Sequence, residues 1–146
     1  MADLTDVTSF VGRNHGLAVV SLVRADGTPQ ASLVNAGVVD HPGSGEPVVG
    51  FVVRGGSYKC RRLREHGFVA VTWTAGWEWI GVEGTTELFG PDDPLADVEA
   101  ASLSHVLREV FRGAGGTHDD WEAYDRVMLE ERRTAVFVRP TRFLGR

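Results

Sequence analysis

Short apolar runs bounded by turn residues constrain the fold of this chain more than any other feature. Runs of this kind, rich in β-branched residues, are typical of β-strands. The sequence predicts strands at residues 17–24, 29–39, 48–54, 68–74, 77–89 and 134–138. Most of these strands are neighbours in the sequence, and Ala25-Asp26-Gly27-Thr28 suits a hairpin turn. The pattern therefore predicts a mainly β fold with short helices (α+β), a barrel of about six antiparallel strands and not a doubly wound parallel sheet.

Helical periodicity is confined to short segments. Helices are expected from Thr5 or Asp6 to Arg13, from the segment Pro91-Asp92-Asp93-Pro94 to Phe111, and from Asp119 or Asp120 onward. Gly81 and Gly84 lie inside the fifth predicted strand, where a glycine usually marks a bulge, a barrel corner or the close approach of a ligand. No repeat, low-complexity tract or linker divides the chain, so residues 1–146 are predicted to form a single domain.

The composition limits the class of protein. The chain has 42% hydrophobic and 24% charged residues and a formal net charge of −5, which is ordinary for a globular protein. The acidic balance and the lack of a second basic cluster argue against nucleic-acid binding. No apolar stretch approaches the roughly 20 residues of a membrane helix. The first residues lack the features of a signal peptide, and a single cysteine, Cys60, fits a reducing compartment. We therefore expect a cytoplasmic protein that binds neither nucleic acid nor membrane.

One segment locally reverses the acidic balance. Gly55-Gly56 follows an apolar run, and Ser57 is a good N-cap for a short helix that Gly67 is expected to end in a left-handed conformation. Four basic residues crowd this helix: Lys59, Arg61, Arg62 and Arg64. Cys60 and Leu63 share a face that can pack inward. Two interpretations remain open, a solvated basic face or a helix N-terminus that binds an anion such as phosphate.

Residues for self-contained catalysis are scarce. The five histidines lack metal-ligand spacing, so no metal site is predicted, and the Gly-x-Ser-x-Gly motif is absent. His118-Asp119-Asp120 sits at a predicted helix start, where capping is the simpler explanation. No catalytic residue can be assigned. A phosphate-binding segment without a catalytic constellation is typical of a protein whose bound cofactor does the chemistry.

Several segments carry a resemblance to a known family. The order of a hairpin, the Gly-Ser-x-Lys helix start at residues 56–59 and the strand Phe68-Val69-Ala70-Val71 resembles the split β-barrel flavin-binding superfamily of pyridoxamine 5′-phosphate oxidase. Residues 76–88 and residues 121–133, which begin Trp121-Glu122-Ala123-Tyr124, resemble the branch that uses the deazaflavin coenzyme F420. The resemblance covers the chain from about Gly16 to Leu144.

The resemblance implies a set of cofactor-binding residues. Lys59 and the helix start at Ser57 and Tyr58 are expected at the cofactor phosphate. Ser32 and Asn35 are expected beside the tricyclic ring, although both could equally be ordinary solvent-facing strand residues. Several relatives have a basic residue where this chain has Ser57, and many have Asn where it has Arg62. Some phosphate contacts are therefore expected to have moved to Arg61 and Arg62. Trp77 and Trp79 are expected to seal a pocket or an interface, or else to fill the core.

The resemblance also implies a function and a partner. The leading hypothesis is an oxidoreductase that transfers a hydride from reduced F420 to an electron-poor double bond of a small organic substrate. The alternatives are an FMN-binding oxidoreductase of the same fold and a non-catalytic carrier of a flavin or deazaflavin. The expected partner is a second copy of the chain, in a homodimer with the cofactor at the interface.

Overall fold

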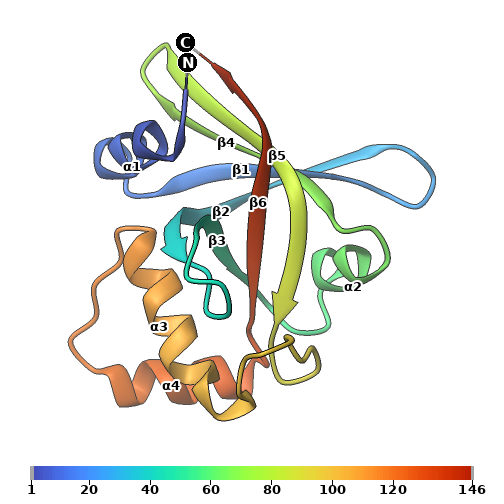
Figure 1. Ribbon diagram of the computed structural model, residues 1–146, viewed down its shortest axis with the longest axis vertical. Coiled ribbons are helices and arrows are strands. Elements are labelled where there is room, and N and C mark those ends of the chain that lie inside the picture. Colours follow the sequence, from blue (N-terminus) through green and yellow to red (C-terminus); the bar gives the residue numbers. More distant parts are fainter. Residues whose placement is uncertain (1, 146) are drawn as a thin grey trace.

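Six antiparallel strands close into a barrel in the computed structural model, which describes residues 2–145 (Figure 1). The strands are β1 (Leu17–Val23), β2 (Pro29–Asp40), β3 (Pro47–Val53), β4 (Phe68–Ala75), β5 (Glu78–Phe89) and β6 (Thr134–Gly145). Around the barrel the order is β1-β2-β3-β6-β5-β4, and each neighbouring pair is antiparallel. The predicted α+β barrel of six antiparallel strands is therefore confirmed.

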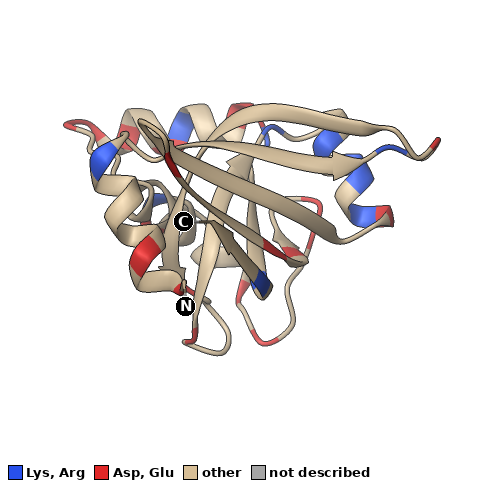
Figure 2. Cartoon of the chain, turned by 90° about the horizontal axis from the view of Figure 1, so that it is seen from above, with Lys and Arg blue, Asp and Glu red and all other residues tan. Residues whose placement is uncertain are grey.

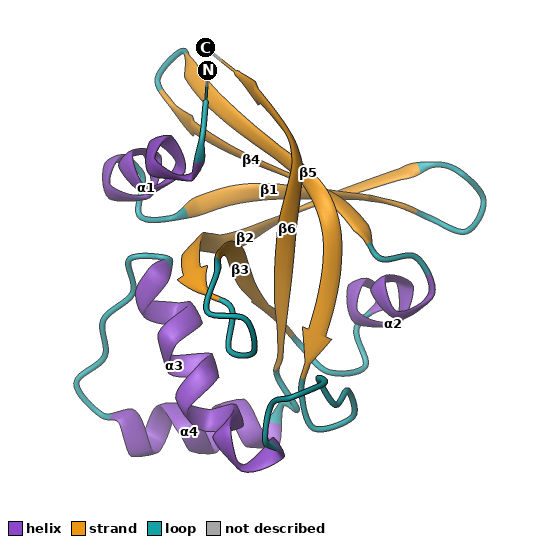
Figure 3. Cartoon of the chain, in the orientation of Figure 1, coloured by secondary structure: helices purple, strands orange, loops and turns teal. Residues whose placement is uncertain are grey.

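Four α-helices of this part of the chain lie outside the barrel. They are α1 (Leu4–Arg13), α2 (Tyr58–Glu65), α3 (Leu103–Gly113) and α4 (Trp121–Glu130), and a 3-10 turn at Ala100–Ser102 leads into α3. Figure 3 shows α3 and α4 lying together beside β2 and β3, whereas α2 lies alone on the other side of β6. Figure 2 shows a group of basic residues on α2 and further basic residues spread over the rest of the chain. Within residues 2–145, no helix combines the length and the apolar character that crossing a bilayer requires.

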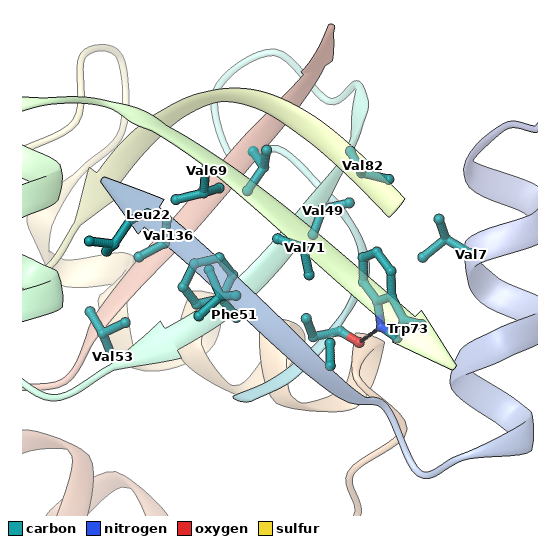
Figure 4. Close-up of a cluster of buried hydrophobic side chains, with 14 of the residues drawn as sticks. Val7, Leu22, Val49, Phe51, Val53, Val69, Val71, Trp73, Val82 and Val136 are labelled. Carbon is teal, nitrogen blue, oxygen red and sulfur yellow. Dashed lines mark hydrogen bonds between the residues drawn. The ribbon is translucent and has the colours of Figure 1, made fainter. Parts of the chain in front are cut away.

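Two clusters of buried apolar side chains hold the fold together. The larger one fills the barrel and includes Val7 of α1, and Trp73 is its largest fully buried member (Figure 4). The Trp73 indole Nε1 donates a hydrogen bond to the Ala36 carbonyl oxygen at 2.9 Å, so its polar atom is satisfied inside the core. The second cluster joins α3 and α4 to the barrel and includes Val110 and Tyr124. This second cluster fixes the two helices against β3 and β6.

The closing strand β6 extends beyond its predicted end. It continues through Pro140 because the register with β5 shifts between Glu83 and Gly84, which pair with Arg142 and Pro140. A bulge tolerates proline, which has no N–H to donate to the ladder. A Cβ atom at Gly84 would lie 2.1 Å from the Arg139 carbonyl oxygen. The prediction that a glycine of β5 marks a bulge is confirmed at Gly84.

Two of the helix starts differ from the sequence prediction in detail. Asp3, and neither Thr5 nor Asp6, is the N-cap of α1, because its carboxylate accepts from the backbone N–H groups of Thr5 and Asp6. Asp6 in turn accepts from the Asp3 N–H at 2.9 Å, which completes a capping box. At α4 the cap is Asp120, one of the two predicted candidates.

The end of α2 is extended and not left-handed, which corrects the prediction for Gly67. His66 is the C-cap with φ −141°, and β4 begins immediately afterwards at Phe68. The Gly67 carbonyl oxygen already accepts from the Thr86 N–H at 3.0 Å. Gly67 is therefore part of the sheet edge and does not reverse the chain.

The segment from Pro91 to Pro94 does not start a helix, contrary to prediction. Helical structure begins only at Ala100. Asp92 pairs with Arg132, and Asp93 accepts two hydrogen bonds of 2.7 Å from Arg64. Both carboxylates therefore tie this loop to neighbouring segments instead of capping a helix.

Candidate functional site

A groove lies between the β2–β3 side of the barrel and the α3–α4 pair. Its volume is about 460 Å³. One wall consists of residues 33–35 and 52–54, the other consists of apolar side chains of α3 and α4, and Ser57, Lys59 and Arg133 lie at its lining. A cavity of this size with few polar groups is typical of a small-molecule site. We call it the groove.

Lys59 provides a half-buried cation in the groove. Cys60 and Leu63 are both buried and pack the apolar face of α2 against the barrel. Lys59, directly before Cys60, lines the groove. The Lys59 ammonium donates to the Ser32 hydroxyl oxygen at 2.9 Å. Burial lowers the pKa of Lys59 below its usual range, and the nearby guanidinium of Arg133 lowers it further. The predicted residues Ser32 and Lys59 are thus in contact.

Two further predicted residues lie with Lys59. The Ser57 hydroxyl accepts from the Cys60 N–H at 3.2 Å, which confirms Ser57 as the N-cap of α2. Asn35 lines the groove, and its amide nitrogen donates to the His15 carbonyl oxygen at 2.9 Å. The groove therefore brings together Ser57, Lys59 and Asn35, with Ser32 directly behind the lysine.

Two arginines that were not among the predicted cofactor-binding residues also line the groove. Arg54 follows β3, and Arg133 precedes β6. Both interact with Glu131: the Arg133 Nε lies 2.8 Å from its Oε1, and an Arg54 nitrogen lies 3.9 Å from its Oε2. Arg54 directly precedes Gly55-Gly56, so its position in the sequence could have indicated a role beside α2. No local sequence signal places Arg133 beside Lys59.

The turn after α4 places Arg133 in the groove. The Arg132 N–H donates to the Leu129 carbonyl oxygen and the Arg133 N–H to that of Met128, at 3.1 and 2.9 Å. This pattern is a Schellman motif, in which Arg132 takes the left-handed position at φ 50°. A Cβ atom at Gly55 would lie 2.4 Å from the Arg132 carbonyl oxygen, so the two loops touch through their backbones.

The other basic residues of α2 point elsewhere. The Arg62 Nε donates to the Val23 carbonyl oxygen at 2.6 Å, and Arg61 donates to that of Gly56. The Tyr58 hydroxyl accepts from the Ala25 N–H at 3.4 Å. Tyr58, Arg61 and Arg62 do not line the groove, and Tyr58 and Arg62 instead tie α2 to the β1–β2 hairpin.

The two tryptophans of the predicted site lie away from the groove of the same chain. Trp77 is 100% exposed in the turn between β4 and β5. Trp79 lines a separate cavity together with Phe10 of α1 and Ile80. One chain by itself therefore does not bring Trp77 or Trp79 to Lys59.

A larger cavity of about 490 Å³ lies on another face of α3. Its lining is acidic, with Asp97, Glu99 and Glu109, and it also includes His41 and His105. This cavity has no lysine or arginine in its lining and is unsuited to an anion. Residues 2–145 contain no group of three or more metal-ligating side chains.

The groove offers binding groups and few groups for acid–base chemistry. The Tyr124 hydroxyl donates to the Leu107 carbonyl oxygen at 3.3 Å, and burial raises the pKa of Tyr124. Cys60 is fully buried in the core. The arrangement can hold an elongated molecule with an apolar body and an anionic end.

Solved structures with this fold bind several cofactors. No family model matches the chain. An F420 reductase is 19% identical with a TM-score of 0.64, over 99% of this chain and 98% of that one. A pyridoxamine 5′-phosphate oxidase-related, FMN-binding protein from Nostoc punctiforme is 14% identical with a TM-score of 0.66, over 99% and 84%. A heme-binding protein from Mycobacterium smegmatis is 12% identical with a TM-score of 0.65, over 100% and 55%.

The TM-scores show that the fold is shared, but identities this low do not identify the ligand of this chain. In all three comparisons the shared topology extends over essentially the whole of this chain. The resemblance drawn from the sequence is therefore confirmed for the architecture: this chain shares its β-barrel fold with an F420 reductase and with a pyridoxamine 5′-phosphate oxidase-related, FMN-binding protein.

Proposed function

We propose that the protein is an oxidoreductase that uses reduced F420 to reduce an electron-poor double bond of a small organic substrate. The observation that carries the proposal is the environment of the Lys59 ammonium. Its half-buried ammonium has a hydroxyl partner, Ser32, and no carboxylate partner among residues 2–145. A desolvated cation without a counter-charge is costly unless a ligand supplies one. The fold shared with an F420 reductase supports the choice of cofactor.

The residues of the groove suit a phosphate-bearing tricyclic cofactor. Lys59 and the first turn of α2, capped by Ser57, would hold the phosphate. Asn35 and the apolar side chains of the groove would orient the ring and exclude water. When bound, F420 would supply the hydride, and the proton would come from solvent.

FMN is the second candidate cofactor, because an FMN-binding protein shares the fold. The third hypothesis is a non-catalytic carrier of a flavin or deazaflavin, and the shortage of acid–base groups in the groove supports it. Cys60, a buried free cysteine, fits the proposed cytoplasmic location.

The absorbance and activity of the purified protein test these readings. Protein from a host that lacks F420 should be colourless, and it should oxidise added reduced F420 in the presence of conjugated enones or imines. A stoichiometric yellow flavin spectrum on isolation would favour the FMN enzyme. Tight F420 binding without turnover of a broad substrate panel would favour the carrier.

A homodimer is the proposed assembly. The strand β1 has apolar residues on both faces: Ala18, Val20 and Leu22 are buried in the barrel, whereas Val19 and Val23 lie on the outer face and are 42% and 43% exposed. A contiguous patch of exposed apolar side chains often marks an interaction site. The exposed Val19 pairs with Leu33 of β2, which is also exposed, so the outer face continues across two strands. We propose that a second copy covers this face.

Val19→Lys is expected to convert the dimer into a monomer. A lysine at the centre of an apolar interface would leave a buried charge without a partner. Light scattering should give twice the 15.9 kDa of one chain for the wild type and about 15.9 kDa for the variant. Leu129→Lys, on the exposed side of α4, is the matched control and should stay dimeric. A wild-type mass near 15.9 kDa would contradict the proposal. In the dimer, Trp77 and Trp79 remain candidates for contact with the partner's cofactor.

A further inference from the structure

Three cations from three separate segments line the groove. They are Arg54 after β3, Lys59 in α2 and Arg133 before β6. The backbone fixes their relative positions, because the Gly55 N–H donates to the Glu131 carbonyl oxygen at 3.1 Å. The nearby guanidinium of Arg133 helps to lower the pKa of Lys59, as expected for two cations placed close together.

Glu131 is the carboxylate that contacts this cluster. Its Oε1 lies 2.8 Å from both Nε and one terminal nitrogen of Arg133, and its Oε2 lies 3.9 Å from Arg54. Three positive charges therefore face one negative charge, which leaves a net charge of +2. Because Glu131 occupies one edge of the planar Arg133 guanidinium, the other edge stays available to donate hydrogen bonds.

We propose that Arg54 and Arg133 complete, with Lys59, a binding site for a doubly charged anionic group, and that Glu131 positions Arg133 in it. Suitable groups are a phosphate monoester, or a phosphate diester next to a carboxylate. The inference rests on the proposed function, since it takes the ligand to be a phosphate-bearing cofactor. It assigns the additional phosphate contacts to two residues outside α2.

The alternative donors within α2 already have other partners. Arg61 and Arg62 donate to backbone carbonyl oxygens and do not line the groove. To bind an anion in the groove, both side chains would have to turn into it. Arg133 already lines the groove, and its partner Glu131 leaves one edge of the guanidinium free.

Binding titrations with cofactor pairs test the proposal. The probes are FMN against riboflavin, and F420 against the deazaflavin without its phosphate-bearing tail. Arg133→Ala is expected to weaken the phosphate-bearing member of a pair about ten-fold, since a charge-assisted hydrogen bond is lost. Binding of the member without phosphate should stay within about two-fold, as should all binding to Arg126→Ala, an exposed control on α4. Arg54→Ala should show a smaller, phosphate-dependent loss.

Glu131 variants separate positioning from charge. Glu131→Ala should weaken phosphate-dependent binding because Arg133 loses its anchor. Glu131→Gln keeps an oxygen acceptor and removes the negative charge, so it should bind at least as tightly as the wild type. Equal losses in both variants would overturn the positioning role of Glu131.

Further outcomes distinguish this inference from the proposed function. If Lys59→Ala weakens phosphate-dependent binding and Arg133→Ala does not, the inference fails and the cofactor site stands. If neither variant has an effect, or if the wild type binds none of the four probes, both fail.

Discussion

Lys59→Ala is expected to weaken cofactor binding more than any other single change at the groove. The ammonium would form a charge-assisted hydrogen bond with the cofactor phosphate, and such a contact is worth about 1.5–3 kcal/mol, or roughly ten- to hundred-fold in affinity. The loss should shrink for a cofactor that lacks the phosphate. Equilibrium titration of the folded variant with each form measures both quantities.

Arg64→Ala is the matched control on the same helix. Arg64 pairs with Asp93 and does not line the groove, so its replacement removes no side chain from the proposed site. Its cofactor affinity should therefore match that of the wild type. Equal affinities for the wild type and Lys59→Ala would mean that α2 presents a solvated basic face and no phosphate site.

The lowered pKa of Lys59 adds a pH dependence to this contact. The ammonium binds an anion only while it is protonated, so affinity should be highest below this pKa and fall as the pH rises through it. The other charged groups near it are Arg54 and Arg133, which line the groove, and Glu131, which contacts both arginines. Lys59→Arg should bind without the alkaline loss, because arginine stays protonated.

Trp73→Ala is expected to cause the largest loss of stability. Trp73 is fully buried in the barrel, and replacing a buried tryptophan by alanine costs about 3–5 kcal/mol through lost contacts and the cavity left behind. The midpoint of denaturant unfolding should fall accordingly. Trp73→Phe retains much of the ring and loses the hydrogen bond to the Ala36 carbonyl oxygen, so it should unfold at an intermediate midpoint. An unchanged midpoint in Trp73→Phe would show that neither the hydrogen bond nor the packing of the indole stabilises the barrel.

Much of the barrel could be predicted because its strands and first turn are encoded by short, continuous sequence patterns. Short apolar runs bounded by turn residues predict the strands, and the turn at residues 25–28 predicts the first hairpin. The inward face of α2 follows from the spacing of Cys60 and Leu63, both of which are buried. Prediction was weaker wherever a residue serves a distant partner. Pro140 resembles a strand end in sequence, yet it lies at a bulge opposite Gly84.

The candidate site was predictable only in part for the same reason. Ser57 and Lys59 belong to one local motif, and the contact between Lys59 and Ser32 matches the expected neighbourhood of the cofactor. Arg133 is far from Lys59 in sequence and reaches the groove through the close contact of Gly55 with Arg132. No periodicity or spacing encodes that contact.

Fluorescence and absorbance titration of the wild-type protein with F420 and with FMN tests the central claim most directly. We expect saturable binding of one F420 per chain, with a tighter dissociation constant than for FMN and weaker binding of either cofactor without its phosphate. Tighter binding of FMN than of F420 would contradict the choice of F420 and favour the FMN-binding oxidoreductase. No saturable binding of either cofactor would contradict the account.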